Sequence, residues 1–408
     1  MLRRGALALL VVALLATSCG DDAKEPGRTG DAAAAAETGP QEYTGSVDGF
    51  YVPPDPLPAG QHGDLLRYQR LDTEVDGAIA YRILYLSTSV KGKPIAVSGV
   101  AALPTAAGDD RPVLSWAHGT TGIADECAPS KQPLEGLEAQ LLGPFLKEGW
   151  IVAATDYEGL GTPGRHPYIA GISEGRGTLD AVRAAKQLPD ARGGHDTIVW
   201  GHSQGGHAAM FANQLAATWT PELKLDGTVA GAPPSELLLI AAALKGGNFQ
   251  GYLAMVAAGL NAAYPEAKLD QVITPKGLAQ IHVVDEGCTD EIFKVYNTLP
   301  YDEFSAGDPA VVEPWKSILE ENDPGHAKTD SPILIIHGEA DEQIPPIASE
   351  LLFKRLCGLG QVIERRTYPG MHHAEVIIPS FPDMLTWMKD RVAGKPAVSG
   401  CPASSPAG

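Results

Sequence analysis

The most informative part of the sequence is residues 197–210, which read TIVWGHSQGGHAAM. The apolar run from Thr197 to Trp200 has the length and the β-branched residues of a buried strand, and the small and apolar residues that follow suit a helix. Between them stands the pattern G-x-S-x-G, in which Ser203 occupies a sharp turn from strand to helix. Small residues are needed on both sides because larger ones would collide. The stretch predicts that Ser203 is a nucleophile.

A second match to this pattern lies at residues 171–175, GISEG. The residues before it, RHPY at 165–168, read as a loop rather than a strand, and those from Ser173 to Leu188 have helical spacing. We therefore interpret Ser173 as the cap of a helix and as a structural residue.

Short apolar runs alternate with helical segments along the rest of the chain. Strands are predicted at residues 78–88, 94–103, 112–117, 150–155, 197–200, 227–230, 333–336 and 362–367, and helices at 134–148, 173–188, 205–217 and 381–392. Such a pattern is typical of a mostly parallel sheet covered by helices on both faces. The expected fold class is α/β.

One part of the chain has helical spacing and no clear strand. Residues 237–244, 252–260 and 290–311 read as helices. We interpret residues 236–324 as a helical cap inserted over one end of the sheet; the alternative is a few ordinary surface helices. The predicted core then has two parts, residues 49–235 and 325–392, followed by a C-terminal tail at residues 393–408.

A nucleophilic serine needs a base to take its proton and an acid to orient that base, in the chain order serine, acid, histidine. After a late strand the chain offers Glu339, Asp341 and Glu342. Asp341 stands in the pattern Gly-x-x-Asp before Ile-Pro, which resembles the acid loop of α/β-hydrolases, and the two glutamates are expected to be solvated. After the last strand, His372 and His373 are adjacent, and the residues alone leave either as the base.

The run HGTTG at residues 118–122 follows a predicted strand at the position where this kind of fold places one half of an oxyanion hole. The residue after the nucleophile supplies the other half. We predict that the N–H groups of Thr120 and Gln204 face the developing oxyanion, with Gly119 as the alternative to Thr120.

The first residues have the order of an export signal, because two arginines precede an apolar run at residues 5–16 that is too short to span a membrane. Small residues then lead to Cys19, and this segment resembles a bacterial lipobox, in which the cysteine becomes the lipidated first residue. We predict a signal peptide at residues 1–18 and lipidation of Cys19, with ordinary secretion as the alternative. Residues 19–48 are expected to form a disordered tether.

The remaining cysteines are Cys127, Cys288, Cys357 and Cys401. Four cysteines in an exported chain fit two disulfides, with three possible pairings. No two of them are close in sequence and no matching Cys/His spacing occurs, so a metal site is not expected.

Three blocks together resemble the secretory lipase family of bacteria and yeasts: HGTTG at 118–122 with CAPS at 127–130, DYEGLGTPG at 156–164, and GHSQGG at 201–206. The resemblance covers residues 49–392. It implies an α/β-hydrolase fold with a helical cap, a Ser-Asp-His triad and no metal or other cofactor.

Carried over to this sequence, the resemblance assigns Ser203, Asp341 and His373 as the triad and favours His373 over His372. The histidine before His373 departs from the residues common in the family at that position. The implied disulfide pairs are Cys127 with Cys288, which would join core and cap, and Cys357 with Cys401.

The resemblance implies an exported or surface-anchored enzyme that hydrolyses carboxylic esters, with lipids or acylglycerols favoured. Residues 237–244 and 255–258 could line an acyl pocket, although apolar helix faces are more often simply packed. Alternatives are a peptidase or thioesterase on the same triad, or a noncatalytic surface lipoprotein. The noncatalytic alternative is disfavoured because a protein without catalytic activity would be free to lose the triad residues, which are all present in the required order.

The charge balance limits the partners. With 50 acidic and 31 basic residues the formal net charge is -19, which argues against nucleic-acid binding. Attachment to a membrane would depend on the lipid on Cys19 and not on charge.

Overall fold

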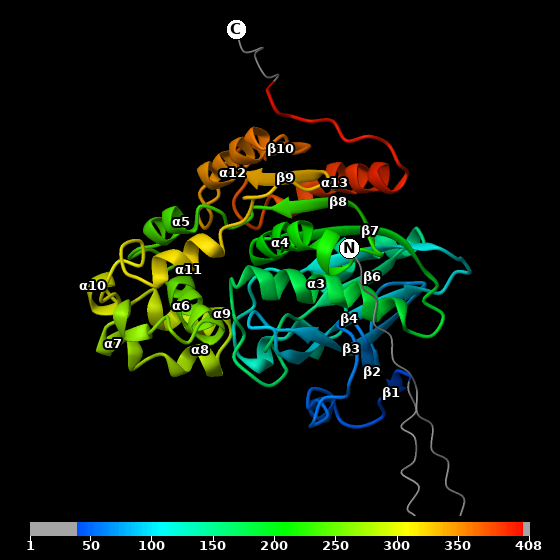
Figure 1. The fold of residues 1–408 in the computed structure, drawn as a ribbon, viewed down its shortest axis with the longest axis horizontal. Coiled ribbons are helices and arrows are strands. Elements are labelled where there is room, and N and C mark those ends of the chain that lie inside the picture. The colour runs from blue at the N-terminus through cyan, green and yellow to red at the C-terminus, as the bar shows by residue number, and fades with distance from the viewer. Residues whose placement is uncertain (1–38, 403–408) are drawn as a thin grey trace, which may run out of the picture. The chain divides into compact units, whose positions relative to one another are not determined.

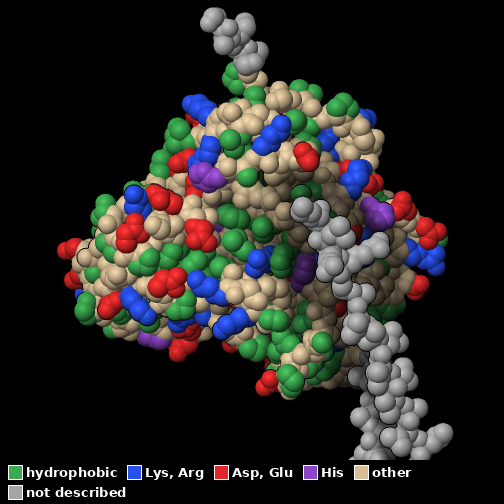
Figure 2. Space-filling view, viewed as in Figure 1, with side chains coloured by type: hydrophobic (Ala, Val, Ile, Leu, Met, Phe, Trp, Pro, Cys, Tyr) green, Lys and Arg blue, Asp and Glu red, His purple; other side chains and the backbone are tan. Residues whose placement is uncertain are grey.

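The computed structural model of the chain describes residues 39–402. The predicted signal peptide, the predicted lipidation site Cys19 and most of the predicted tether lie outside the described residues. No helix in the described range is long and apolar enough to cross a bilayer. Acidic and basic side chains are interspersed over the face seen in Figure 2.

One sheet runs through the described part of the chain, in the strand order β1-β2-β3-β4-β6-β5-β7-β8-β9-β10 (Figure 1). The strands are β1 (Gln41–Glu42), β2 (Leu65–Leu71), β3 (Ala78–Thr88), β4 (Pro94–Pro104), β5 (Arg111–Ala117), β6 (Ile151–Thr155), β7 (Gly193–His202), β8 (Lys224–Gly231), β9 (Ile333–Gly338) and β10 (Ile363–Tyr368). Strands β2, β3, β4 and β6 pair antiparallel, and all pairs from β6 through β10 are parallel. The prediction of a mostly parallel sheet is confirmed.

Helices cover both faces of this sheet. The helices that pack on it are α2 (Gly136–Lys147) and α13 (Ile377–Val392) on one face, and α3 (Gly171–Lys186), α4 (Gln204–Trp219) and α12 (Pro346–Gly358) on the other. In β7, Ile198 and Trp200 pack with α2 and α13, whereas Val199 packs with α3 and α4. A strand buried on both sides needs consecutive apolar residues, which is why β7 reads as an unbroken apolar run.

The chain between β8 and β9 forms a helical insertion, Leu237–Glu321, that lies beside the sheet (Figure 1). Its helices are α5 (Leu237–Ala243), α6 (Gly251–Ala263), α7 (Pro275–Leu278), α8 (His282–Glu286), α9 (Thr289–Tyr296), α10 (Tyr301–Phe304) and α11 (Trp315–Glu321). The single helix expected at residues 290–311 is wrong: α9 ends at Tyr296, and α10 starts after Pro300. Pro300 takes the N-cap position of α10, and its ring and missing N–H disfavour a continuous helix through this position.

The two ends of the insertion meet at one place. The N–H of Glu236, just before α5, donates to Oδ1 of Asp323, just after α11, over 2.5 Å. Arg355 of α12 forms ion pairs with both carboxylates. The insertion is also joined to the core by a disulfide between Cys127 and Cys288.

The second disulfide joins Cys357, in α12, to Cys401 in the C-terminal tail. Both pairs are those implied by the family resemblance. The bonded pairs have Cα atoms 5.6 and 5.5 Å apart, as disulfides require.

The expected tether is too long at its C-terminal end. Gln41 and Glu42 form β1, and a short helix, α1 (Val47–Phe50), follows. Tyr43, next to β1, packs against α1, because its ring lies edge-on to the Phe50 ring with centroids 5.6 Å apart. This tyrosine gives the last part of the predicted tether an apolar contact with the folded chain.

Helix α3 starts earlier than predicted. Its first residue is Gly171 and Ala170 occupies the N-cap position, so Ser173 is not a cap. The Ser173 hydroxyl instead donates to the Glu158 carboxylate. Ser173 is thus a structural residue, for a reason other than the one predicted.

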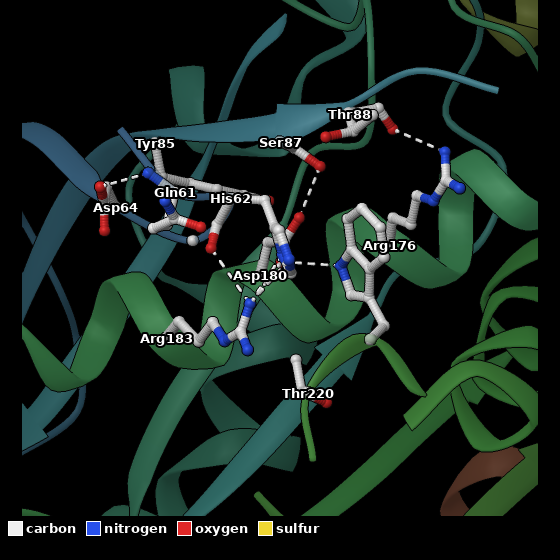
Figure 3. Close-up of polar contacts among 12 residues, drawn as sticks. Gln61, His62, Asp64, Tyr85, Ser87, Thr88, Arg176, Asp180, Arg183 and Thr220 are labelled. Atoms are coloured by element: carbon white, nitrogen blue, oxygen red, sulfur yellow. Dashed lines mark hydrogen bonds and ion pairs between the residues drawn. The ribbon is translucent and has the colours of Figure 1, made fainter. Parts of the chain in front are cut away.

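The loop before β2 is attached to α3 through a buried carboxylate (Figure 3). Asp180 accepts hydrogen bonds from Ser87 Oγ at 2.7 Å and Trp219 Nε1 at 2.9 Å, and His62 Nδ1 lies 2.7 Å away. The His62 ring stacks on Trp219 with centroids 3.8 Å apart. Asp180 therefore fixes three separate segments to one helix.

Candidate active site

The predicted site residues follow four strands of the parallel part of the sheet. Thr120 follows β5, Ser203 follows β7, Asp341 follows β9 and His373 follows β10. Because these strands are parallel, their carboxyl ends lie at the same edge of the sheet, where ligand sites form in open α/β sheets.

Ser203 lies at a strained turn between β7 and α4. Its φ of 59° and ψ of -123° are in a region that residues with a side chain rarely adopt. The flanking glycines are required by contact distances: a Cβ on Gly201 would lie 2.2 Å from the Gly205 carbonyl oxygen, and a Cβ on Gly205 would lie 1.8 Å from the Ala117 carbonyl oxygen. The turn can form only because both positions lack side chains.

Asp341 and His373 form a buried pair. His373 Nδ1 lies 2.7 Å from Asp341 Oδ2, and the two residues are 5% and 7% exposed. The other ring nitrogen of His373, Nε2, is buried and has no hydrogen-bond partner within the described residues. The structure shows no hydrogen bond between Ser203 and His373, which is common where no substrate is bound. The His202 ring, next to Ser203 in the chain, lies 4.8 Å from the His373 ring.

Four donors surround the Asp341 carboxylate. Oδ1 accepts from the N–H groups of Gln343 and Ile344 at 2.9 and 2.8 Å, and Oδ2 faces His337 Nε2 at 3.1 Å as well as His373. Burial alone would raise the pKa of Asp341, but the hydrogen bonds from His337 and His373 hold this pKa well below its ordinary value. Asp341 is therefore a fixed negative charge that orients His373.

His372 has a different environment from its neighbour. Its side chain is 53% exposed and its Nδ1 lies 2.9 Å from the Glu342 carboxylate, which raises the pKa of His372. The His372 ring makes its ion pair with Glu342 and not with Asp341, and it belongs to the solvated rim of the site. Among residues 39–402 no group of three or more His, Cys, Asp or Glu side chains is arranged to hold a metal ion.

The residues predicted to hold the oxyanion lie on both sides of Ser203. Gln204 is the first residue of α4, so its N–H has no partner within the helix. Gly119 lies close to the nucleophile, since a Cβ built on it would be 3.8 Å from the Ser203 Cβ. The next residue, Thr120, contacts Tyr168 through their hydroxyl groups, 2.7 Å apart.

An apolar cavity, partly open to solvent, is lined in part by Ser203. Helices α5 and α6 provide most of its wall. The lining residues include Leu237, Ile240, Ala241, Leu244, Leu253 and Val256 from the insertion, and Tyr168, Gln343 and Ile344 from the core. A second apolar cavity deeper in the insertion shares Ala241, Leu253 and Val256 with the first. Met255 and Ala258, also considered as pocket residues, are instead fully buried in the core of the insertion.

Two buried groups beside Ser203 were not predicted. His207 and Glu174, both fully buried, lie 2.6 Å apart on α4 and α3. No periodicity or motif in the sequence indicates this contact, because it joins residues 33 positions apart.

The parallel sheet with a strained serine between β7 and α4, and with acid and histidine after later strands, defines the α/β-hydrolase fold. The same fold is found in solved structures, including Candida antarctica lipase A, with a TM-score of 0.76 and 23% identity over 86% of this chain and 87% of that one. The esterase LipA from Xanthomonas oryzae has a TM-score of 0.66 and 21% identity over 82% of this chain and 97% of that one.

The chain belongs to the secretory lipase family, whose model matches residues 129–400. Relatives include Lipase 6 of Candida albicans, 29% identical over 87% of this chain and 83% of that protein. Another is the secreted triacylglycerol lipase LIP4 of Malassezia globosa, 29% identical over 87% of this chain and 82% of that protein. The family membership identifies the chain as a carboxylic ester hydrolase.

Proposed function

We propose that this chain is an exported serine hydrolase that cleaves lipid esters through Ser203, Asp341 and His373 and an acyl-enzyme intermediate. The observation that carries the proposal is the position of Ser203, at a strained turn and in the lining of an apolar cavity. The buried Asp341–His373 pair contacts the residue before it, because the rings of His202 and His373 have centroids 4.8 Å apart.

The reaction has two halves. His373 Nε2 takes the proton of the Ser203 hydroxyl as its oxygen attacks the ester carbonyl, and Asp341 stabilises the imidazolium that forms. The negative charge that develops on the carbonyl oxygen is held by the N–H groups of Gln204 and Thr120. His373 then gives its proton to the leaving alcohol. Water repeats the sequence on the acyl-enzyme, releases the acid and restores Ser203.

The unpartnered Nε2 of His373 supports this assignment of the base. A general base needs a free nitrogen that faces the reacting centre, and Asp341 already fixes the opposite nitrogen as a donor. His372 has an exposed ring held by Glu342 instead. We therefore assign the proton transfer to His373 alone.

We infer that residues 236–324 act as a cap that holds the acyl chain of the substrate. The wall of the cavity at Ser203 is formed mainly by side chains of α5 and α6, and apart from Tyr252 these are aliphatic. A hydrocarbon chain is stabilised there by about 0.8 kcal/mol for each buried methylene. We infer that a longer chain would extend past Ala241 into the second cavity, since the two cavities share Ala241, Leu253 and Val256 as lining residues. Triacylglycerol is named as the substrate class of the Malassezia globosa relative.

The N-terminal assignments extend this proposal. Residues 1–18 would be removed as a signal peptide, and a lipid on Cys19 would hold the enzyme at the outer face of the cell membrane. Residues 49–235 and 325–392 would form the catalytic core, with residues 393–408 as a tail attached through Cys401. Mass spectrometry of the mature N-terminus tests the anchor: an unmodified N-terminus downstream of Cys19 would refute it.

A substrate panel with a nucleophile variant tests the function. Rates on p-nitrophenyl esters from acetate to palmitate should rise with chain length, by about fourfold in kcat/KM for each methylene that enters the cavity. Ser203→Ala should abolish activity, and a fluorophosphonate probe should label the wild type only at Ser203. A preference for acetate with no activity above butyrate would reject lipid esters as substrates, and an active Ser203→Ala would reject the triad.

A further inference from the structure

The second G-x-S-x-G segment, residues 171–175, lies at the start of α3, against α4. Both of its glycines are required by this packing. A Cβ on Gly171 would lie 2.2 Å from the Phe211 ring, and a Cβ on Gly175 would lie 2.8 Å from the Phe211 carbonyl carbon and 2.9 Å from the Ala212 nitrogen. The glycines allow the two helices to approach closely, so that the residue between them, Glu174, reaches the first turn of α4.

Glu174 is fully buried, and all of its contacts are donors. Oε1 accepts from the Gln204 side-chain Nε2 at 2.9 Å and from the Ile169 N–H at 3.1 Å. Oε2 lies 2.6 Å from His207 Nδ1. Burial alone would raise the pKa of Glu174, but His207 lowers this pKa below its ordinary value. Three donors and no acceptor around the carboxyl group indicate that it is ionised.

His207 is the buried partner of Glu174. Its Nδ1 faces the Glu174 carboxylate, and its Nε2 lies 2.8 Å from the backbone carbonyl oxygen of Asn322. The ring thus joins the carboxylate on α3 to the chain just after α11. Buried carboxylates of this kind persist only when they are paired and hydrogen-bonded.

The Gln204 side chain is held from a second side by His166. Gln204 Nε2 lies 2.8 Å from His166 Nε2, and His166 Nδ1 lies 2.8 Å from the Glu158 carbonyl oxygen. Burial lowers the pKa of His166 to about 4, so the ring is neutral, with Nδ1 as donor and Nε2 as acceptor. Both hydrogens of the Gln204 amide are therefore used, which fixes the side chain of the residue that follows the nucleophile.

Glu174 is also linked to Thr120, on the second segment of the proposed oxyanion hole. Its Oε1 accepts a hydrogen bond from the N–H of Ile169, the neighbour of Tyr168. The hydroxyl of Tyr168 contacts the hydroxyl of Thr120, and Tyr168 lines the cavity at Ser203. One carboxylate oxygen thus supports Gln204 directly and Thr120 through one intervening side chain.

We propose that Glu174, paired with His207, is a positioning residue that sets the two halves of the oxyanion hole, the N–H groups of Gln204 and Thr120, relative to Ser203. This inference rests on the proposed function. It assigns the second G-x-S-x-G segment a role in the same reaction as the first: the segment provides the buried carboxylate and the close helix contact that aligns the donors.

Replacement of Glu174 tests this role. Glu174→Met removes the acceptor of Gln204 and Ile169, and kcat should fall about 10- to 100-fold because the donors lose their alignment with the transition state. KM should change less than about threefold, since the cavity that holds the acyl chain is untouched. Glu174→Gln keeps an oxygen at Oε1 and can donate to a neutral His207, so it should recover kcat to within about threefold of the wild type.

Asp180→Leu is the matched control. Asp180 lies on the same helix, is fully buried and also faces three donor groups, but these belong to the loop before β2, to β3 and to the end of α4 (Figure 3). This variant should lower the melting temperature and leave kcat per active site unchanged. Active sites are counted by fluorophosphonate labelling taken to completion, so that losses of folded protein do not count as losses of rate.

A boronic acid inhibitor provides a readout that a purely structural role would not change. Its tetrahedral adduct with Ser203 places an anionic oxygen in the oxyanion hole. The inhibition constant should rise in Glu174→Met by the same factor as kcat/KM falls. Gln204→Met, which removes the same hydrogen bond from the other end, should show the same losses and replaces Glu174→Met if that variant does not fold. Where both single variants fold, the double variant should be no slower than either of them.

A kcat per site within about threefold of the wild type in Glu174→Met or Gln204→Met would overturn the inference. So would a rise in KM with kcat unchanged, because that result would indicate a role in substrate binding. Failure of the proposed function is recognised separately, in the wild type, by absent labelling or by an active Ser203→Ala.

Discussion

Replacing each of the two adjacent histidines in turn by alanine gives the sharpest test of the catalytic assignment. His373→Ala removes the proposed base, whereas His372→Ala removes its exposed neighbour in the same loop. His373 is 5% exposed and its ring contacts Asp341, while the ring of His372 contacts the partly exposed Glu342. The two variants differ by one position in sequence and remove the same imidazole ring.

The structure sets the expected size of each effect. Loss of a triad histidine costs about 10⁴- to 10⁶-fold in kcat, or about 5 to 8 kcal/mol in activation free energy. The His373→Ala protein should still fold, because Asp341 keeps three of its four donors and loses one charge-assisted hydrogen bond of about 1.5 to 3 kcal/mol. His372→Ala should change kcat by less than about fivefold, since an ion pair at the solvated rim contributes little.

The assay is hydrolysis of a p-nitrophenyl ester under saturation, with melting temperatures to verify folding. Ser203→Ala defines the background rate. The reasoning is refuted if His373→Ala keeps more than about 1% of the wild-type kcat. It is also refuted if His372→Ala loses more activity than His373→Ala, because the free Nε2 of His373 would then have no catalytic use.

Three further predictions concern the pocket, the disulfides and pH. Ala241→Phe, at the boundary of the two cavities, should reduce kcat/KM for palmitate esters and spare butyrate esters in the same panel. Loss of the Cys127–Cys288 bond, which closes 161 residues, should cost about 5 kcal/mol in denaturant unfolding, against about 4 for the Cys357–Cys401 bond, which closes 44. Burial raises the pKa of Asp156 to about 6, so the folded state binds this proton more tightly than the unfolded chain does, and the free energy of unfolding falls as pH rises from about 4 to 6. The melting temperature of Asp156→Asn should therefore fall less than that of the wild type across this pH range. An equal fall in both proteins would exclude Asp156 as the cause.

Features with a local cause could be predicted from the sequence. The strand β3 has the predicted bounds, and β7 and α4 flank Ser203 as the pattern G-x-S-x-G requires, because the strained turn, the glycines and the apolar run are all neighbours in the chain. The order of Ser203, Asp341 and His373 follows from the topology of the sheet, which fixes where each strand ends.

Features that depend on distant contacts could not be predicted. Strand β2 was missed because its residues, LLRYQRL, mix apolar with long polar side chains without a regular alternation and gain their order from pairing with β3. The start of α3 was misplaced because Gly171 is helical only through its packing on Phe211. The pairing of Glu174 with His207 depends on that same contact between α3 and α4, so neither helix sequence alone indicates it.

The hydrogen bond between Glu236 and Asp323 has a consequence for how the helical insertion can vary among members of this family. Glu236, where the chain leaves the sheet, and Asp323, where it returns, are 87 positions apart in sequence but in contact in the fold. Arg355 of α12, a helix that packs on the sheet, forms ion pairs with both residues. The strands before and after this contact therefore need no particular length of chain between them. Helices can be added to, shortened in or exchanged within this interval without altering the connectivity of the sheet, so substrate range can evolve independently of the catalytic residues.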